Sequence, residues 1–95
     1  MNGIGRWRYT VYGLVQGVGF RWRARHAAEA VGVTGWVRNG LDGSVTMELQ
    51  GSAEQVGRVL ESIERGSFIR IERLERESLP PVDGERGFAV RDDRW

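Results

Sequence analysis

The residues best suited to chemistry in this sequence form a glycine-rich run, GLVQGVGFR, from Gly13 to Arg21. Strand-like alternation precedes the run and helical spacing follows it, so the run should lead from a strand into the start of a helix. The first backbone N–H groups of a helix have no partner within it, and in a glycine-rich turn several of them can converge on one anion. The run therefore favours an anion-binding loop.

Three arginines in the first turns of the expected helix strengthen this interpretation. Arg21, Arg23 and Arg25 precede the first acid, Glu29, although positive charge near a helix N-terminus opposes the helix dipole. A bound anion of about two negative charges would remove the conflict, and a guanidinium can hold it through two parallel hydrogen bonds. The alternative is a simple tight turn followed by solvated arginines, which is the more frequent explanation of a glycine-rich turn by itself.

The composition limits the chemistry that is available. The 95 residues include no cysteine, which excludes disulfides and thiolate sites, and no lysine, because all fourteen cations are arginine. The net charge is +1, but residues 1–38 hold six arginines against Glu29 alone, a net +5, and residues 39–95 carry a net −4. The first part of the chain should therefore meet an anionic partner, whereas the balanced total argues against a general nucleic-acid or membrane binder.

The chain shows no segment of the kind that enters a membrane. No apolar run approaches the roughly 20 residues that span a bilayer, and the first residues lack the apolar stretch of a signal peptide. We expect a cytoplasmic protein that forms a single domain, 1–95, with its core at about 7–91.

Hydrophobic periodicity predicts the elements that must position the loop. Gly32 stands where a helix C-terminal glycine belongs, Ser52 and Gln55 form a capping-box signature, and Gly66 should end the second helix. An Asp-Gly pair indicates a hairpin turn. The expected elements are a strand at 7–12, a helix at 20–31, hairpin strands at 35–39 and 44–50, a helix at 53–65, a strand at 69–74 and a short strand at 88–90.

The order of these elements is β-α-β-β-α-β with a possible fifth short strand. Each helix has one apolar face that needs a sheet to cover it, and the split β-α-β arrangement places both helices on the same side. We therefore predict an α+β, ferredoxin-like sandwich with two helices on one face of an antiparallel sheet. This architecture hosts RNA binders, small-molecule sensors and enzymes, so it does not define the function.

Two motifs strongly resemble the acylphosphatase family. The loop at 13–21 matches the signature G-x-V-Q-G-V-x-[FY]-R, and the segment GWVRNGLDG at 35–43 matches the hairpin signature G-W-V-x-N…D-G-x-V, both without a gap. The resemblance covers about residues 7–91 and includes the closing FAVR at 88–91. It implies the ferredoxin-like fold and the hydrolysis of acyl phosphates to a carboxylate and inorganic phosphate, with no metal and no cofactor.

The resemblance also implies roles for individual residues. Arg21 would hold the phosphoryl group with its side chain, and Asn39 would orient the attacking water. Gly40 departs from the best-known animal members, which have a threonine beside the asparagine, and this puts the support of Asn39 in question. The implied substrate-binding segment consists of Gln16, Gly17, Val18, Gly19, Phe20 and Arg21, with the N–H groups of residues 17–21 as the phosphate cradle.

These residue types suit an acyl phosphate. Its leaving group is a carboxylate of pKa about 4, so departure needs no general acid, and phosphoryl transfer then depends mainly on positioning and charge stabilisation. A phosphate monoester would instead ask for an acid or a metal. We expect a small-molecule acyl phosphate as substrate, inorganic phosphate or another anion as ligand, no nucleic-acid or membrane partner, and a monomer.

Two other functions stay open from the sequence. A non-catalytic anion-binding or regulatory module would bind phosphate without turnover, and is similar to the acylphosphatase-like domains of larger hydrogenase-maturation proteins. An RNA binder on the same scaffold would need base-stacking aromatic residues on the central strands, and residues 44–50 contain none.

The remaining distinctive residues receive structural interpretations. Arg25 lies one turn after Arg21 and either enlarges the positive field or pairs with Glu29. Arg23 lies about 200° around the helix from Arg21 and should face solvent, as should His26. Trp7 and Trp36 are expected in the core, whereas the pattern gives no place to Trp22 and Trp95.

Overall fold

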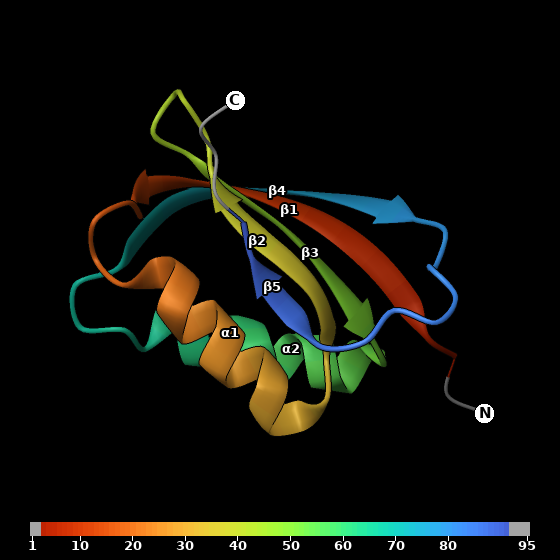
Figure 1. The fold of residues 1–95 in the computed structure, drawn as a ribbon. Coiled ribbons are helices and arrows are strands. Elements are labelled where there is room, and N and C mark those ends of the chain that lie inside the picture. The colour runs from red at the N-terminus through yellow and green to blue at the C-terminus, as the bar shows by residue number, and fades with distance from the viewer. Residues whose placement is uncertain (1–2, 92–95) are drawn as a thin grey trace.

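The chain forms two helices on one face of a five-stranded sheet in residues 3–91, the part that the computed structural model describes (Figure 1). Trp95 lies outside the described residues. The predicted α+β arrangement is therefore confirmed. The elements are β1 (Gly5–Leu14), α1 (Phe20–Val31), β2 (Thr34–Asn39), β3 (Val45–Gly51), α2 (Ala53–Glu64), β4 (Arg70–Leu79) and β5 (Phe88–Val90).

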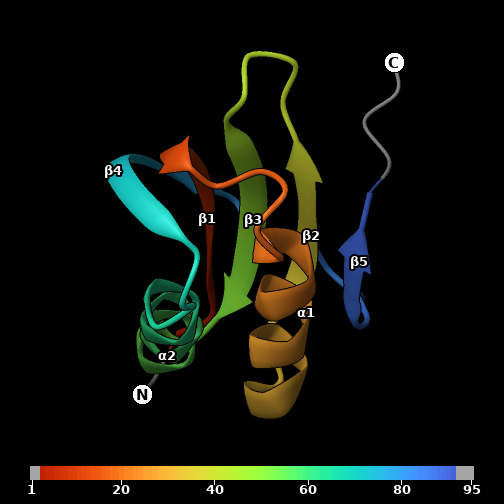
Figure 2. The same cartoon turned by 90° about the vertical axis from the view of Figure 1, so that its left-hand side faces the viewer.

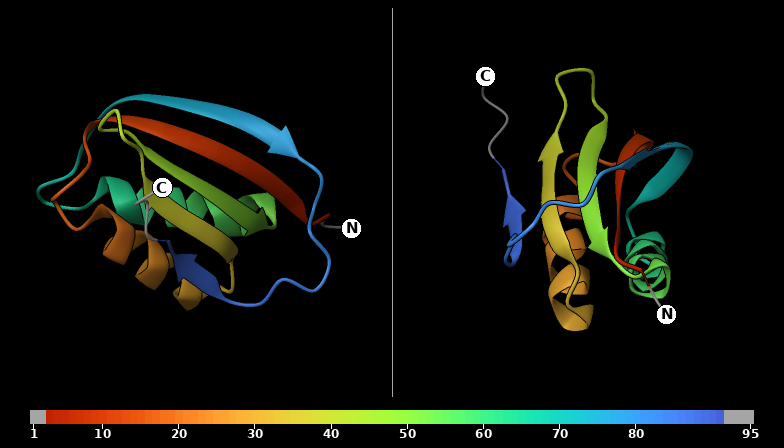
Figure 3. Two further views of the ribbon diagram at one scale, coloured as in Figure 1. Left: turned by 45° about the horizontal axis from the view of Figure 1, so that its top comes forward. Right: turned by 90° about the vertical axis from the view of Figure 1, so that its right-hand side faces the viewer.

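The sheet has the strand order β4-β1-β3-β2-β5. The four strands of the β-α-β-β-α-β unit pair antiparallel, but β5 pairs parallel with β2, with Gly35 opposite Phe88. The expectation of a wholly antiparallel sheet is wrong at this edge. Figures 2 and 3 show why: β4 and β5 are opposite edges, and the connection between them runs around the end of the sheet before β5 starts beside β2.

The core lies between the helices and the sheet. Tyr9 and Val11 alternate inward from β1, and the small side chains of Ala24 and Ala28 let α1 approach the sheet closely. A buried aliphatic or aromatic side chain contributes about 1.5–3 kcal/mol relative to an exposed one. Trp7 is half-buried and packs against this cluster, as expected. The buried residues of α2 are Val56, Val59 and Ile63.

The helix ends follow the predicted signals. Gly32 takes a left-handed conformation at the end of α1, with φ 79°. At the start of α2 the Ser52 hydroxyl accepts from the Gln55 N–H at 3.1 Å, and Gln55 Oε1 accepts from the Ser52 N–H at 2.8 Å. In the described part of the chain, neither helix is long and apolar enough to cross a membrane.

Trp36 is buried, but on the sheet face away from the helices. It alternates with the core residue Val37 along β2 and is 8% exposed. The guanidinium of Arg38 lies 5.3 Å from the Trp36 ring centroid, and that of Arg91 lies 4.4 Å from it. Trp36 is therefore a buried core residue, as expected, but it lies outside the cluster between the helices and the sheet, and charged side chains cover its ring through cation–π contacts.

Arg6 forms a buried ion-pair network on the same face of the sheet. Its side chain is 4% exposed, and its guanidinium donates to Glu48 at 2.8 Å and to Glu85 at 2.7 Å. Arg8 also donates to Glu48, at 2.8 Å. Because Glu85 lies in the connection between β4 and β5, the network joins this connection to β1 and β3.

Candidate functional site

The glycine-rich segment between β1 and α1 forms a loop whose backbone donors are free. Gly17 and Gly19 have φ values of 73° and 81°, in the left-handed region that favours glycine, and Gly19 is the N-cap of α1. The Arg23 N–H makes the first helical hydrogen bond, to the Gly19 carbonyl at 2.9 Å. Within the described chain, no N–H of residues 16–22 donates to a backbone carbonyl. These donors are available to an anion.

Two buried side chains fix the loop at its ends. Val15 is 1% exposed and Phe20 is 2% exposed, and both belong to the main hydrophobic cluster. The loop between them is therefore held in shape by the core before any ligand binds, which is the preorganisation that an anion site needs.

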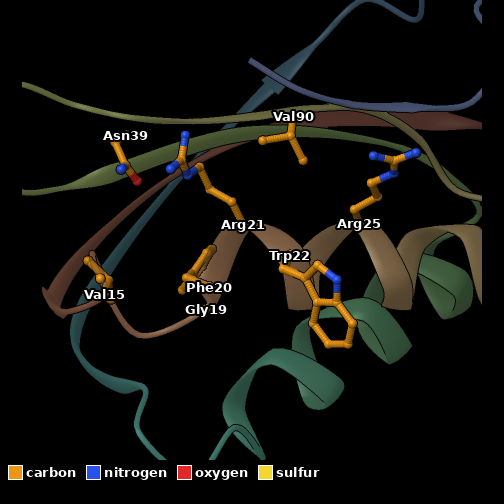
Figure 4. Close-up of a pocket in the computed structure, with 9 residues that line it drawn as sticks. Val15, Gly19, Phe20, Arg21, Trp22, Arg25, Asn39 and Val90 are labelled. Atoms are coloured by element: carbon orange, nitrogen blue, oxygen red, sulfur yellow. The ribbon is translucent and has the colours of Figure 1, made fainter. Parts of the chain in front are cut away.

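A pocket of about 400 Å³ opens beside this loop. Arg21 extends over the loop from the first turn of α1, and Asn39 reaches the same space from the end of β2 (Figure 4). The Arg21 Nη1 donates to the Arg91 carbonyl at 3.4 Å. The residues that line the pocket are Val15, Gly17, Gly19, Phe20, Arg21, Trp22, Arg25, Asn39 and Val90.

The hairpin turn that follows Asn39 is tightly bonded. The Gly40 N–H donates to the Ser44 carbonyl at 2.7 Å, and Asp42 Oδ1 accepts from the Ser44 N–H at 3.0 Å and from its hydroxyl at 2.6 Å. The Ser44 hydrogen bonds hold the pKa of Asp42 below its usual value. A Cβ at Gly40 would lie 2.8 Å from Ser44 Oγ, so a threonine there would disturb the turn.

Gln16 and Val18 do not line this pocket, although both belong to the implied substrate-binding segment. The Gln16 amide is directed to the hairpin, where Nε2 donates to the Gly40 carbonyl at 2.7 Å and to the Ser44 carbonyl at 2.8 Å. Val18 lines a neighbouring pocket instead. The structure therefore brings Gly17, Gly19, Phe20, Arg21 and Asn39 together and turns the Gln16 amide away.

The other arginines of α1 have partners of their own. Arg25 forms the expected ion pair with Glu29, at 3.2 Å. It also lines the pocket. Arg23 does not face solvent as expected: its Nε donates to the Ser62 carbonyl at 2.5 Å. The packing of α1 against α2 brings this carbonyl of the last turn within reach, and sequence periodicity contains no information on that packing.

Aromatic and apolar residues at the pocket were only partly foreseen. His26 is exposed, as expected, and its ring lies 4.1 Å from that of Trp22. Trp22 is 63% exposed at the pocket edge. Val90 reaches the pocket because β5 joins the sheet edge beside α1, a long-range event that no local pattern signals.

The chemistry that the pocket offers is hydrogen-bond donation. Among residues 3–91, no carboxylate or imidazole lines it, and no group of three or more His, Asp or Glu side chains is placed to hold a metal ion. Its polar groups are the guanidinium groups of Arg21 and Arg25, the side-chain amide of Asn39 and the backbone N–H groups of the loop. Such donors suit an anion with several oxygen atoms, and they can orient a water molecule beside it.

The sequence model of the family described as Acylphosphatase matches residues 7–90. This chain belongs to the acylphosphatase family. An acylphosphatase of Pseudomonas paraeruginosa is 46% identical over 82 residues, covering 85% of this chain and 89% of the relative. An acylphosphatase of Yersinia pseudotuberculosis is 42% identical over 83 residues, with the same coverage of 85% and 89%.

Solved structures agree with the sequence comparison. The structure of an acylphosphatase from Coxiella burnetii matches with a TM-score of 0.83 at 31% identity, covering 95% of this chain and 94% of that chain. The predicted family, the ferredoxin-like fold and the assignment as an acylphosphatase hydrolase are confirmed.

Proposed function

We propose that this acylphosphatase binds the phosphoryl group of its substrate on the N–H groups of residues 17–21 and the Arg21 side chain, while Asn39 positions the attacking water. The observation that supports the proposal is one pocket lined by the loop, by Arg21 and by Asn39, which come from three different parts of the fold. The two side chains meet above the loop in Figure 4.

The phosphoryl group is recognised by its charge and by its several oxygens. The unpaired N–H groups at the start of α1 and the helix dipole both favour an anion. Arg21 adds a positive charge with a planar fork of donors, which can bind two phosphoryl oxygens at once. This explains why arginine is present at a helix end where the dipole alone would disfavour it.

The reaction is an in-line displacement at phosphorus. A water oxygen held by the Asn39 amide forms the new P–O bond, while the bond from phosphorus to the acyl oxygen breaks and its electron pair leaves with the carboxylate. The proton of the water passes to phosphate or solvent. Because the leaving carboxylate is weakly basic, with a pKa of about 4, it needs no protonation by the enzyme.

Charge stabilisation supplies most of the rate enhancement in this scheme. The amides and the guanidinium are fixed before the substrate arrives, so they need no reorganisation as charge spreads over the phosphoryl oxygens. Losing one such donor costs roughly 10²–10³ in rate. We further infer a small-molecule acyl phosphate substrate, inorganic phosphate as a ligand, no metal, cofactor, nucleic acid or membrane partner, and a monomeric single domain in the cytoplasm.

Arg21→Gln tests the proposal directly when release of phosphate from benzoyl phosphate is measured. We expect kcat/KM to fall by at least about 10²-fold, because the guanidinium contacts the transferring group. Arg23→Gln is the matched control on the same helix, since its side chain is directed to Ser62, and it should leave kcat/KM within about twofold. Equal turnover in both variants and the unchanged enzyme would contradict the proposal.

A further inference from the structure

The pocket is larger than its phosphate site. A phosphoryl group has four heavy atoms and occupies on the order of 100 Å³ at the volume per heavy atom of liquid water. The pocket has a volume of about 400 Å³ and continues past Arg21 along α1 to Trp22, Arg25 and Val90. The additional space must accommodate the rest of the substrate or water.

Two apolar side chains in this part of the pocket are left exposed. Trp22 is 63% exposed and Val90 is 40% exposed, and neither belongs to the buried core cluster. The Trp22 ring is supported by His26, with ring centroids 4.1 Å apart and an interplanar angle of 44°. The indole therefore presents an accessible apolar surface on the residue that follows Arg21 in the chain.

The proposed reaction indicates which part of the substrate should face this surface. In Figure 4 Asn39 lies to the left of the Arg21 guanidinium, Val90 to its right and the Trp22 ring to its lower right. In-line displacement places the leaving group opposite the attacking water. With water at Asn39, the carboxylate and its acyl group point toward Trp22 and Val90.

We infer that Trp22 and Val90 form an acyl-group subsite that favours flat, apolar acyl groups, such as aromatic ones, over small acyl groups. The inference rests on the proposed function of Arg21 and Asn39. Arg25 borders the subsite, but its charge is balanced by Glu29 at 3.2 Å, so the subsite has no unpaired cation that would select a second anionic group. The subsite would therefore recognise the acyl group by stacking on the Trp22 indole.

A second pocket beside the loop offers an internal comparison. It has a volume of about 570 Å³ and shares only Gly17 with the lining of the first pocket, and Leu14, Val18 and Phe68 are among its residues. Phe68 is 75% exposed, so it matches Trp22 as an accessible aromatic side chain near the loop. Neither Arg21 nor Asn39 lines this pocket, so we do not expect it to hold the leaving group.

The test compares benzoyl phosphate with acetyl phosphate in the full-length enzyme. For Trp22→Ala we expect kcat/KM to fall roughly five- to tenfold with benzoyl phosphate and less than about twofold with acetyl phosphate. Trp22→Phe should retain most of the preference, because it keeps an aromatic face. Phe68→Ala should leave the ratio unchanged, and inhibition by inorganic phosphate should be equal in all variants, because phosphate occupies only the cradle.

Each alternative result overturns the subsite. Equal losses with both substrates in Trp22→Ala would mean that the indole acts on the loop or the fold, and no loss with either would place the acyl group elsewhere. A changed ratio in Phe68→Ala alone would place it in the neighbouring pocket. Failure of the proposed function shows up separately, as turnover that survives Arg21→Gln.

Discussion

The side-chain amide of Gln16 donates to the main-chain carbonyl of Gly40 at 2.7 Å, so one residue of the phosphate loop holds the residue that follows Asn39. The same amide donates to the Ser44 carbonyl at 2.8 Å, on the other side of the hairpin turn. These two hydrogen bonds connect the glycine-rich loop to the hairpin turn next to Asn39, so in the proposed mechanism they help to set the distance between the phosphate-binding N–H groups and the Asn39 amide. We therefore expect Gln16 to act as a positioning residue for Asn39.

Gln16→Ala should lower kcat with benzoyl phosphate by about 10- to 100-fold, because a displacement of about 1 Å in the reacting groups can cost 10²-fold. Inhibition by inorganic phosphate should change less than about threefold, since the cradle amides and Arg21 stay in place. Steady-state kinetics with phosphate as a competitive inhibitor separates the two effects.

Gln55→Ala is the control for this substitution. The Gln55 amide also bridges two segments, from α2 to the Val31 carbonyl at 2.9 Å, but far along the chain from the loop. Losing it should reduce the free energy of unfolding by about 1 kcal/mol and leave kcat unchanged. A kcat that falls equally in both glutamine variants would show that Gln16 acts through general stability.

Gly19→Ala should reduce both phosphate binding by the loop and the free energy of unfolding. No atom lies within 4 Å of a Cβ built at Gly19, so the substitution causes no clash, but the φ of 81° is unfavourable for alanine by about 1 kcal/mol. The loop should shift to relieve this strain, which moves the cradle N–H groups and raises the inhibition constant for phosphate. Phosphate inhibition and urea unfolding together measure the two consequences.

Gly57→Ala is the control for Gly19→Ala: the same substitution at this position should stabilise the protein. Gly57 lies within α2, has no positive φ and also has open space around its Cβ position. Alanine there should raise the free energy of unfolding by about 0.5–1 kcal/mol without any change in phosphate inhibition. Equal effects at positions 19 and 57 would contradict the role given to the loop conformation.

The Arg6 ion-pair network should make the free energy of unfolding depend on pH in the acidic range. Burial alone would raise the pKa of both carboxyls, but other groups together outweigh it and lower the pKa: hydrogen bonds and charges from Arg6 and Arg8 at Glu48, and the Arg6 hydrogen bond and charge with a Thr34 hydrogen bond at Glu85. A lowered folded-state pKa means that the pairing stabilises above the unfolded value of about 4.3 and is lost as pH falls through the folded value. The free energy of unfolding should therefore decrease below about pH 4.

Glu85→Gln tests this dependence by urea unfolding at pH 7 and pH 3. The variant should be less stable than the unchanged protein at pH 7, and the difference should shrink at pH 3, which lies below the unfolded-state pKa of about 4.3. Glu54→Gln is the control, because Glu54 forms an exposed pair with Arg58 at 3.1 Å and should change stability by less than about 0.5 kcal/mol. A Glu85→Gln difference that is independent of pH would contradict the network's role.

Local signals predicted most of the fold. The glycines of the loop, Gly32 at the end of α1 and the reciprocal bonds of Ser52 and Gln55 all depend on neighbours within a few residues, so periodicity and capping rules reach them. The residue sequences of the loop and the hairpin also indicated the family. The pairing of β5 with β2 depends on the path of a long connection, which no local rule describes.

The sequence was less informative about polar side chains that act over long distances. Alternation places Arg6 outside the helix-covered face, but its burial requires Glu85 to arrive from a segment distant in the chain. The same reason explains Arg23, whose partner lies on the other helix, and Gln16, whose amide is used by the hairpin. Residue type and spacing identify donors, whereas the partner is decided by tertiary packing.

The most direct test of the central claim is the effect of Asn39→Ala on kcat and on phosphate inhibition in a single kinetic experiment. Arg38→Ala is the neighbouring control, because Arg38 lies beside Trp36 on the other face of β2. The account predicts that Asn39→Ala lowers kcat by roughly 10²–10³ while the inhibition constant for phosphate stays within about threefold. A kcat that is unchanged, or a loss that is matched by an equal loss of phosphate binding, would contradict the division of work between Arg21 and Asn39.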